Sequence, residues 1–242
     1  MRRKHLLPPD QGRRASATGN GALYPTAGAL LRYERSSAST ASTTWYDLSP
    51  SGNNGTAADA NMFADFYFDS VVDQVISAQP EPSHDFSSDW TLAWWYKRDL
   101  TLAQGFNTIM QTRRSGPNGG YILRDRTNST PPTPADLADW SFEVVSPYQI
   151  MGLAIKGTDA DWHFACAVWT VGSPNRLETY IDGVPYKSLS TPNSPVNGDV
   201  LNIGRGTYYR FAGYLDTVRS YPRALSAGEI ARDYNAGKAQ HT

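Results

Sequence analysis

Apolar and polar positions alternate along much of this chain, and that alternation predicts a protein built from β-strands. The clearest run covers residues 86–99. Its two faces carry the sets Thr91, Ala93, Trp95 and Leu92, Trp94, Tyr96. We expect this run to be a central strand.

Other apolar or aromatic runs lie between glycine and proline breaks and predict further strands. They cover residues 27–34, 107–111, 120–124, 140–145, 162–169, 177–181 and 201–204, with a closing strand from residue 211. Residues 66–76 have strand composition with a loop inside. The pair Asp182-Gly183 is a strong signal for a hairpin turn. Residues 125–139 are too rich in proline for a sheet and predict an exposed loop.

A short helix is predicted near the end of the chain. Ser226 and Glu229 have the spacing of a capping box, and Gly237 marks the other end. The helix would bury one face against the sheet through Leu225, Ile230 and Tyr234. We expect it to cover an edge or an end of the strand assembly.

Charge divides the chain into an arm and one domain. Residues 1–28 hold five basic residues against one acidic residue, a net charge of +4, whereas the remainder holds 17 basic and 22 acidic residues, a net charge of −5. The basic residues of the arm are Arg2, Arg3, Lys4, Arg13 and Arg14. The arm shows no periodic pattern of apolar residues, which predicts either an unstructured terminus or a tether to a partner surface. Without interleaved aromatic residues it is a poor match to a nucleic-acid-binding segment. Residues 29–242 are long enough for one sizeable core and show no second domain boundary.

The sequence bears on the cellular location of the protein and on its cysteine chemistry. No apolar run reaches the length that crosses a bilayer. The basic N-terminal residues are followed by Pro8, Pro9 and Asp10 rather than by an apolar segment, so we expect no secretory signal. Cys166 is the single cysteine, which excludes an internal disulfide, and its apolar neighbours predict a packed core thiol.

Four segments carry a resemblance to a known family. They are the turn at residues 45–56 with Trp45, Asp47 and Gly55, the strand at 86–99, the hairpin at 162–185 and the closing segment at 211–237. In this order they resemble the laminin-G-like domains of the concanavalin A-like lectin/glucanase superfamily, of the kind found in phage structural proteins. The resemblance covers residues 30–237. It departs at Pro50 and Ser51, and at Ser70, where the family has glycine. It implies an all-β fold, a two-sheet antiparallel jelly-roll sandwich with a short C-terminal helix behind the extended N-terminal arm. In the turn, we expect positive φ angles at Asn53, Asn54 and Gly55.

The sequence gives little support for catalysis or for zinc binding. Glycosidases of this superfamily carry paired carboxylates in a Glu-x-Asp-x-Glu pattern, and none of the five glutamates stands in one. Those glutamates are Glu34, Glu81, Glu143, Glu178 and Glu229. The four histidines have no ligand spacing that suits zinc. We expect no enzyme activity and no zinc.

Calcium and sugar sites are the remaining candidates. The resemblance implies Ca²⁺ in some relatives, and the possible ligands here are Asp65, Asp69 and Asp73, unless these aspartates only cap loops. No other cofactor is expected. The candidate sugar-stacking rings are Tyr148, Tyr208, Tyr209 and Phe211, unless they pack within the closing strands.

Together these features predict a non-enzymatic virion surface protein. It would be a capsid decoration subunit or a fibre- or tail-associated adhesion module, attached to shell or tail proteins by the arm, and able to form a trimer. The alternative is a carbohydrate-binding lectin-like module that recognises cell-surface glycans. A glycoside hydrolase is the third hypothesis.

Overall fold

The structure is a computed structural model, and it describes most of the chain beyond residue 27. The described residues are 28–38, 42–58, 63, 66–69, 75–77, 79–80, 85–99, 108–112, 120–125, 139–146, 149–156, 160–191, 197–205 and 211–241. The arm, with its five basic residues, lies outside this described part.

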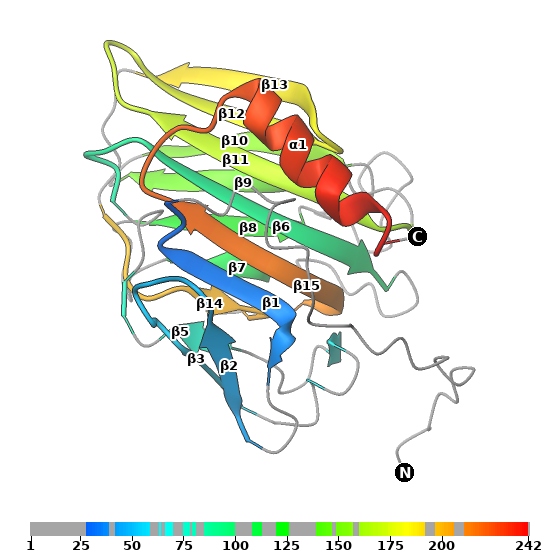
Figure 1. Ribbon diagram of the computed structural model, residues 1–242. Helices are drawn as coiled ribbons and strands as arrows, with labels where there is room; N and C mark the ends of the chain where they lie inside the picture. The colour runs from blue at the N-terminus through cyan, green and yellow to red at the C-terminus, as the bar shows by residue number, and fades with distance from the viewer. Residues whose placement is uncertain are drawn as a thin grey trace, which may run out of the picture.

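The described residues form β-strands and one helix (Figure 1). The first strands are β1 (Leu31–Ala38), β2 (Thr44–Asp47), β3 (Gly55–Ala57), β4 (Tyr67–Asp69), β5 (Val75–Ser77), β6 (Trp90–Arg98), β7 (Thr108–Gln111) and β8 (Tyr121–Asp125). The remaining elements are β9 (Asp139–Ser146), β10 (Gln149–Lys156), β11 (His163–Thr170), β12 (Asn175–Ile181), β13 (Val184–Thr191), β14 (Asn202–Ile203), β15 (Ala212–Tyr221) and α1 (Ala227–Lys238). None of the described helical structure is long and apolar enough to span a membrane.

The strands follow one antiparallel hydrogen-bonded path that bends into two layers. Its order is β10-β9-β8-β7-β14-β5-β3-β2-β1-β15-β6-β11-β12-β13, with β4 paired to β15. The front layer consists of β1, β15, β6, β11, β12 and β13, and the layer behind it consists of β7, β8, β9 and β10 (Figure 1). At the ends of the path, β10 comes close to β12 and β13, which nearly closes the sandwich. The expected two-sheet sandwich is confirmed, with the two layers joined through β14, β5, β3 and β2.

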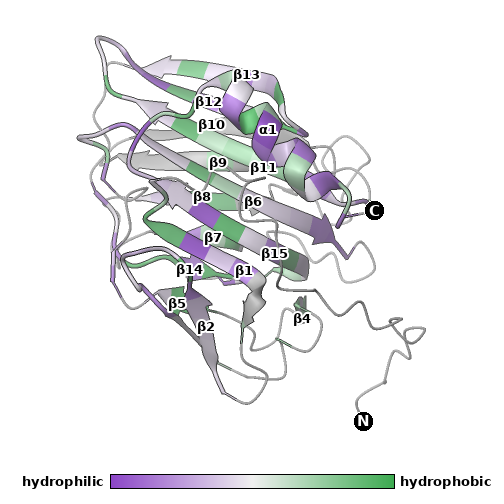
Figure 2. Ribbon diagram, in the orientation of Figure 1, coloured by the Kyte–Doolittle hydropathy of each residue, from purple (hydrophilic) through white to green (hydrophobic). Residues whose placement is uncertain are grey.

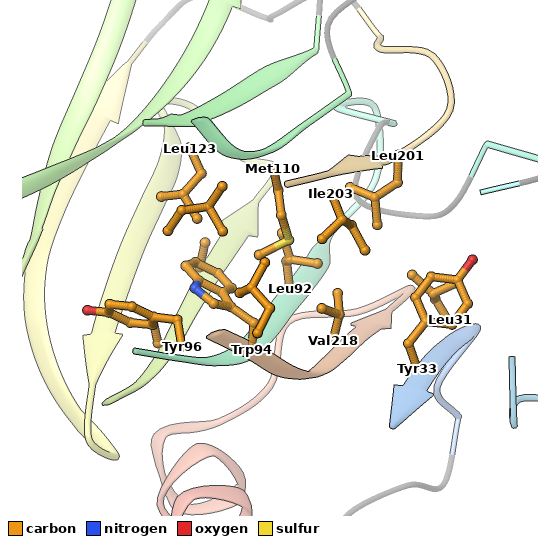
Figure 3. Close-up of a cluster of buried hydrophobic side chains, with 14 of the residues drawn as sticks. Leu31, Tyr33, Leu92, Trp94, Tyr96, Met110, Leu123, Leu201, Ile203 and Val218 are labelled. Carbon is orange, nitrogen blue, oxygen red and sulfur yellow. The ribbon is translucent and has the colours of Figure 1, made fainter. Parts of the chain in front are cut away.

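An inner core fills the space between the layers. Leu92 and Trp94 of β6 point toward Met110 and Leu123 of the rear layer, and Tyr96 lies beside Trp94 in the same cluster (Figure 3). Trp90 packs against Tyr121 and Phe142 from the opposite layer, with ring centroids 6.1 Å away in both cases. These large side chains are almost completely buried, as expected for residues that dominate core energetics.

A second, outer core lies between the front layer and α1. The other face of β6 contributes Ala93 and Trp95, and the helix segment contributes Leu225, Ile230 and Tyr234. The apolar face expected for the helix is therefore confirmed. Figure 2 shows hydrophilic residues on the visible side of α1 and at the end of β6. The front layer is thus buried on both faces where the helix covers it.

Local contacts fix α1 and the hairpin before it. The Ser226 side chain accepts from the Glu229 amide, and the Glu229 side chain accepts from the Ser226 amide, which confirms the capping box. Asp182 and Gly183 have φ angles of 50° and 80°, the geometry of a two-residue hairpin turn between β12 and β13. Some strand expectations differ from the structure. β1 lies four residues later than expected, β2 and β3 are strands at the two ends of the turn expected over residues 45–56, and β10 was not predicted.

Candidate functional site

Four ring side chains lie next to one another on the outer face of the front layer, at the end of the sandwich where α1 ends. Ring centroids are 5.0 Å apart for Tyr67 and Tyr214, 6.1 Å for Tyr214 and Trp162, and 4.9 Å for Trp162 and His241. Tyr67, Tyr214 and Trp162 are partly exposed, whereas His241 is buried. We call these four residues the aromatic row. It is a surface of flat rings built from three strand regions and the segment after α1.

Strand pairing explains why these rings meet. Tyr214 of β15 lies opposite Tyr67 of β4 on one side and opposite Lys97 of β6 on the other. The next residue, Leu215, belongs to the inner core, so the alternation of β15 turns Tyr214 outward. Gly213 allows the close approach of the strands, because a Cβ there would lie 2.3 Å from the carbonyl oxygen of Lys97.

Charged groups border the aromatic row. The Tyr67 hydroxyl donates to Asp99 Oδ2 at 2.6 Å. Lys97 is partly exposed beside Tyr214, and the exposed Asp161 precedes Trp162 in the chain. The row therefore combines ring faces with carboxylate and ammonium groups, the mixture of apolar and oriented polar groups found in small-ligand sites.

His241 closes one end of the row through contacts on both ring nitrogens. Its Nε2 lies 2.6 Å from Asp216 Oδ2, and its Nδ1 lies 2.9 Å from the carbonyl oxygen of Gly237. The ring stacks on Trp95 with a centroid distance of 4.0 Å and an interplanar angle of 4°. Its side chain is 2% exposed. These contacts hold the residues after α1 against β6 and β15.

The turn between β2 and β3 is organised by the carboxylate of Asp47. It accepts the backbone N–H groups of Arg32, Ser49 and Asn53 at 2.8–2.9 Å, which satisfies donors that a tight turn would otherwise leave unpaired. The expected positive φ angles at Asn53, Asn54 and Gly55 are wrong. Gly52 takes this conformation instead, with φ of 61°, because a residue without Cβ adopts it at little cost.

The glutamate side chains that the structure describes are all in ion pairs. Glu34 contacts Arg32 at 2.7 Å and Arg219 at 3.0 Å. Glu178 pairs with Arg176 at 2.9 Å, and Glu229 pairs with Arg223 at 2.6 Å. The pair between Arg219 and Asp233 joins β15 to α1 beneath the helix.

Cys166 and His163 have structural roles. Cys166 is completely buried in the outer core, as expected, and burial raises the pKa of its thiol well above the usual value, with Asp233 adding to the effect. A thiol in this setting is a poor nucleophile. His163 Nδ1 lies 2.9 Å from Asp182 Oδ2, which joins the start of β11 to the hairpin turn.

The residues expected to form a site mostly fall elsewhere. Phe211 is completely buried and packs on Phe68 with centroids 6.0 Å apart, so its expected role in sugar stacking is wrong. Tyr148, Tyr208, Tyr209, Asp65 and Asp73 lie outside the described residues, as do Arg2, Arg3, Lys4, Arg13 and Arg14. Asp69 stands in β4 opposite Ala212, and its side chain is outside the described part. Within that part, no group of three or more His, Cys, Asp or Glu side chains is placed to hold a metal ion.

Comparison with known proteins identifies the fold and the family. Comparison with curated proteins gives no match. The receptor-binding regions of botulinum neurotoxins share the fold. The binding domain of serotype D matches with a TM-score of 0.62 and 14% identity over 86% of this chain and 51% of that chain. The binding domain of serotype C1 matches with a TM-score of 0.62 and 11% identity over 86% of this chain and 52% of that chain.

A serotype D domain solved in complex with N-acetylneuraminic acid matches with a TM-score of 0.60 and 14% identity over 86% of this chain and 50% of that chain. The chain therefore spans about half the length of these structures. At such low identity the likeness concerns the fold alone. A family model described as concanavalin A-like lectin/glucanases superfamily matches residues 69–231, and the chain belongs to this laminin-G-type family.

Proposed function

We propose that this domain is a non-enzymatic binding module that recognises carbohydrate through the aromatic row. The observation that carries the proposal is the contiguous set of partly exposed rings of Tyr67, Tyr214 and Trp162, with centroids 5.0–6.1 Å apart. The ring planes are tilted by 58° and 51°, so the row forms a cradle rather than a flat platform. A cradle of this kind suits a sugar unit held from more than one side.

The chemistry of the row suits a sugar. A pyranose has apolar C–H faces that pack on aromatic rings, and hydroxyl groups around its edge that require hydrogen-bond partners. Asp99, which accepts from the Tyr67 hydroxyl, and Lys97, which lies opposite Tyr214, stand at the border of the row to supply an acceptor and a donor. Both halves of the requirement are therefore met on one face.

A binding role, rather than hydrolysis, is supported by the ion pairs that the described glutamates form. Glu34, Glu178 and Glu229 are all engaged with arginines, and Glu229 also caps α1. A glycosidase needs two carboxyl groups that face one scissile bond at a suitable separation. None of these three glutamates lies in the aromatic row.

The comparisons add indirect support. The family is named for lectins as well as glucanases. One of the similar structures comes from botulinum neurotoxin type C, whose cell entry depends on interaction with two ganglioside molecules, and another is a complex with N-acetylneuraminic acid. Because the chain spans about half of those structures, these ligands are not assigned to the shared half, and the aromatic row remains the basis of the proposal.

The test is a glycan-array screen of wild-type protein and of single variants. We expect saturable binding that falls at least tenfold in Trp162→Ala and Tyr214→Ala, which corresponds to about 1.4 kcal/mol or more of lost binding free energy. Tyr46→Ala is the matched control, because Tyr46 is 47% exposed but stands on β2, separated from β15 by β1. Absence of binding across the array, or equal losses in the control and the row variants, contradicts the proposal.

A role at the virion surface is a second proposal, motivated by the charge of the chain. Residues 1–28 carry a net charge of +4 and the remainder −5, which suits a basic tether ahead of an adhesion domain. We expect removal of residues 1–28 to abolish association with virion shell or tail proteins and to leave glycan binding intact. Co-sedimentation with particles measures the first, and analytical ultracentrifugation tests whether the protein forms a trimer. Particle association that survives the deletion argues against the tether.

A further inference from the structure

Lys97 stands on the outer face of the front layer, between the backbone positions of two residues of the aromatic row. On one side it lies opposite Tyr214 of β15. On the other side, the pairing of β6 with β11 begins at Tyr96 and His163, and Trp162, which directly precedes His163, comes next to Lys97. Alternation along β6 puts Lys97 on the face that carries the outer core. Figure 2 shows this end of β6 as hydrophilic.

The side chain of Lys97 is partly exposed and makes no hydrogen bond, ion pair or ring contact with the residues that the structure describes. Several other cations are engaged within the protein. Arg219 and Arg223 form ion pairs with glutamates. Lys187 and Lys238 each lie 5.4 Å from the centroid of a tyrosine ring. A lysine ammonium has three N–H donors and no acceptor, so Lys97 offers a positive charge and its donors to a ligand in the row.

The carboxylates beside the row already have partners within the protein. Asp99, which follows β6, accepts the Tyr67 hydroxyl at 2.6 Å. Asp216 Oδ2 lies 2.6 Å from His241 Nε2, and the Asp216 side chain is 12% exposed. A carboxylate can only accept hydrogen bonds, so these groups suit the hydroxyl groups of a ligand and repel an anionic group. Lys97 is therefore the position in the row that suits an anion.

We propose that Lys97 selects an acidic sugar, one that carries a carboxylate or sulfate group, an inference that rests on the aromatic row being the sugar site. The acidic group accepts from the Lys97 ammonium, and hydroxyl groups of the sugar donate to Asp99. The C–H face of the sugar packs on the rings of Tyr214 and Trp162. An ion pair adds charge attraction to the hydrogen bond, and a neutral hydroxyl at the same place lacks this attraction. Attraction at Lys97 and repulsion at Asp99 together set the orientation of the ligand.

The test compares acidic sugars with neutral counterparts that differ only in the acidic group. The probes are glycosides of glucuronic acid and N-acetylneuraminic acid beside their methyl esters, and sulfated galactose beside galactose. Isothermal titration calorimetry at low ionic strength measures each affinity, because salt screens the charge attraction. We expect the wild type to bind the acidic member of the carboxylate pairs or of the sulfate pair about tenfold more tightly, which corresponds to about 1.4 kcal/mol. The pairs that show this preference distinguish a carboxylate ligand from a sulfate ligand.

Variants of Lys97 assign the preference to this side chain. In Lys97→Gln we expect the acidic and neutral members to bind equally, with the affinity for the neutral member unchanged. Lys97→Arg keeps the positive charge and with it the preference. Lys187→Gln is the matched control, because Lys187 is exposed on β13, at the far end of the front layer from the row. Lys97→Gln should melt at the wild-type temperature, since the side chain has no partner among the described residues.

Equal affinity of the wild type for both members of every pair, or a preference that survives in Lys97→Gln, overturns the inference. The outcomes also separate it from the proposed function. If Trp162→Ala removes the binding of neutral and acidic sugars alike while Lys97→Gln changes neither, the row is the sugar site and Lys97 selects nothing. If acidic sugars bind through Lys97 but Trp162→Ala and Tyr214→Ala bind them as the wild type does, Lys97 holds the anion and the aromatic row is not the site.

Discussion

Single aspartate side chains satisfy backbone donors at many turns of this protein. Asp47 accepts three backbone N–H groups, and Asp182 accepts the amide of Phe164 at 3.0 Å. Asp89 accepts the amide of Val171 at 2.8 Å, across 82 positions of the chain. A carboxylate used in this way stabilises a loop without any ligand. The fold alone therefore accounts for these three aspartates, which stand in loops around β2, β6 and β12.

The pair of Glu229 and Arg223 gives a prediction at the residue scale. Hydrogen bonds from Arg223 and from the Ser226 amide lower the pKa of Glu229 to about 2. A lowered pKa means that the carboxylate stabilises the folded state above its unfolded value of about 4.3 and that this contribution is lost as the pH falls toward 2. Because Arg223 is 43% exposed, we expect Glu229→Gln to cost only about 0.5 kcal/mol near pH 7.

Thermal unfolding of wild type and Glu229→Gln at several pH values checks this effect. The difference in melting temperature should shrink from about pH 4 downward and vanish near pH 2, as the carboxylate of the wild type takes up a proton. Arg223→Gln completes a double-mutant cycle that isolates the pair. A difference that grows at low pH would falsify this assignment.

At the scale of elements, the sequence pattern predicted the strands that carry clear alternation. β6, β11 and the hairpin of β12 and β13 lie where the pattern placed them. β1 and β10 differ because their limits depend on partners remote in the chain. β1 continues to Ala38 by pairing with β15 and β2, and β10 pairs along its whole length with β9. A run such as residues 149–156, with Met, Gly and Ala, has weak strand propensity of its own.

The aromatic row could be predicted only in part. Tyr67 stands between the buried Phe66 and Phe68, and Tyr214 precedes the buried Leu215, so alternation alone indicates that both tyrosines face away from the inner core. Their meeting with Trp162 depends on the register between β4, β15, β6 and β11, which no local pattern specifies. The prediction that Phe211 stacks on a sugar was wrong, because Phe211 packs inward on Phe68.

At the scale of the whole molecule, the front layer separates two cores, and that arrangement gives the last prediction. Trp94 belongs to the inner core and Trp95 to the outer core, with exposures of 1% and 2%. If the outer face were only a surface covered by a loosely attached helix, Trp95→Ala would cost little. We expect Trp94→Ala and Trp95→Ala each to lower the free energy of unfolding by about 3–5 kcal/mol, because each leaves a large cavity in packed surroundings.

Chemical denaturation measures both variants, with the exposed Tyr46→Ala as the reference, for which we expect a change within about 0.5 kcal/mol. Equal losses at Trp94 and Trp95 mean that α1 is part of the cooperative fold rather than an appendage. The helix is then a rigid support for His241, which follows it, and for Trp95 beneath it. If Trp95→Ala lowered the free energy of unfolding as little as Tyr46→Ala does, α1 would not be part of the cooperative fold of the sandwich. The aromatic row would then be left to Tyr67, Tyr214 and Trp162 alone.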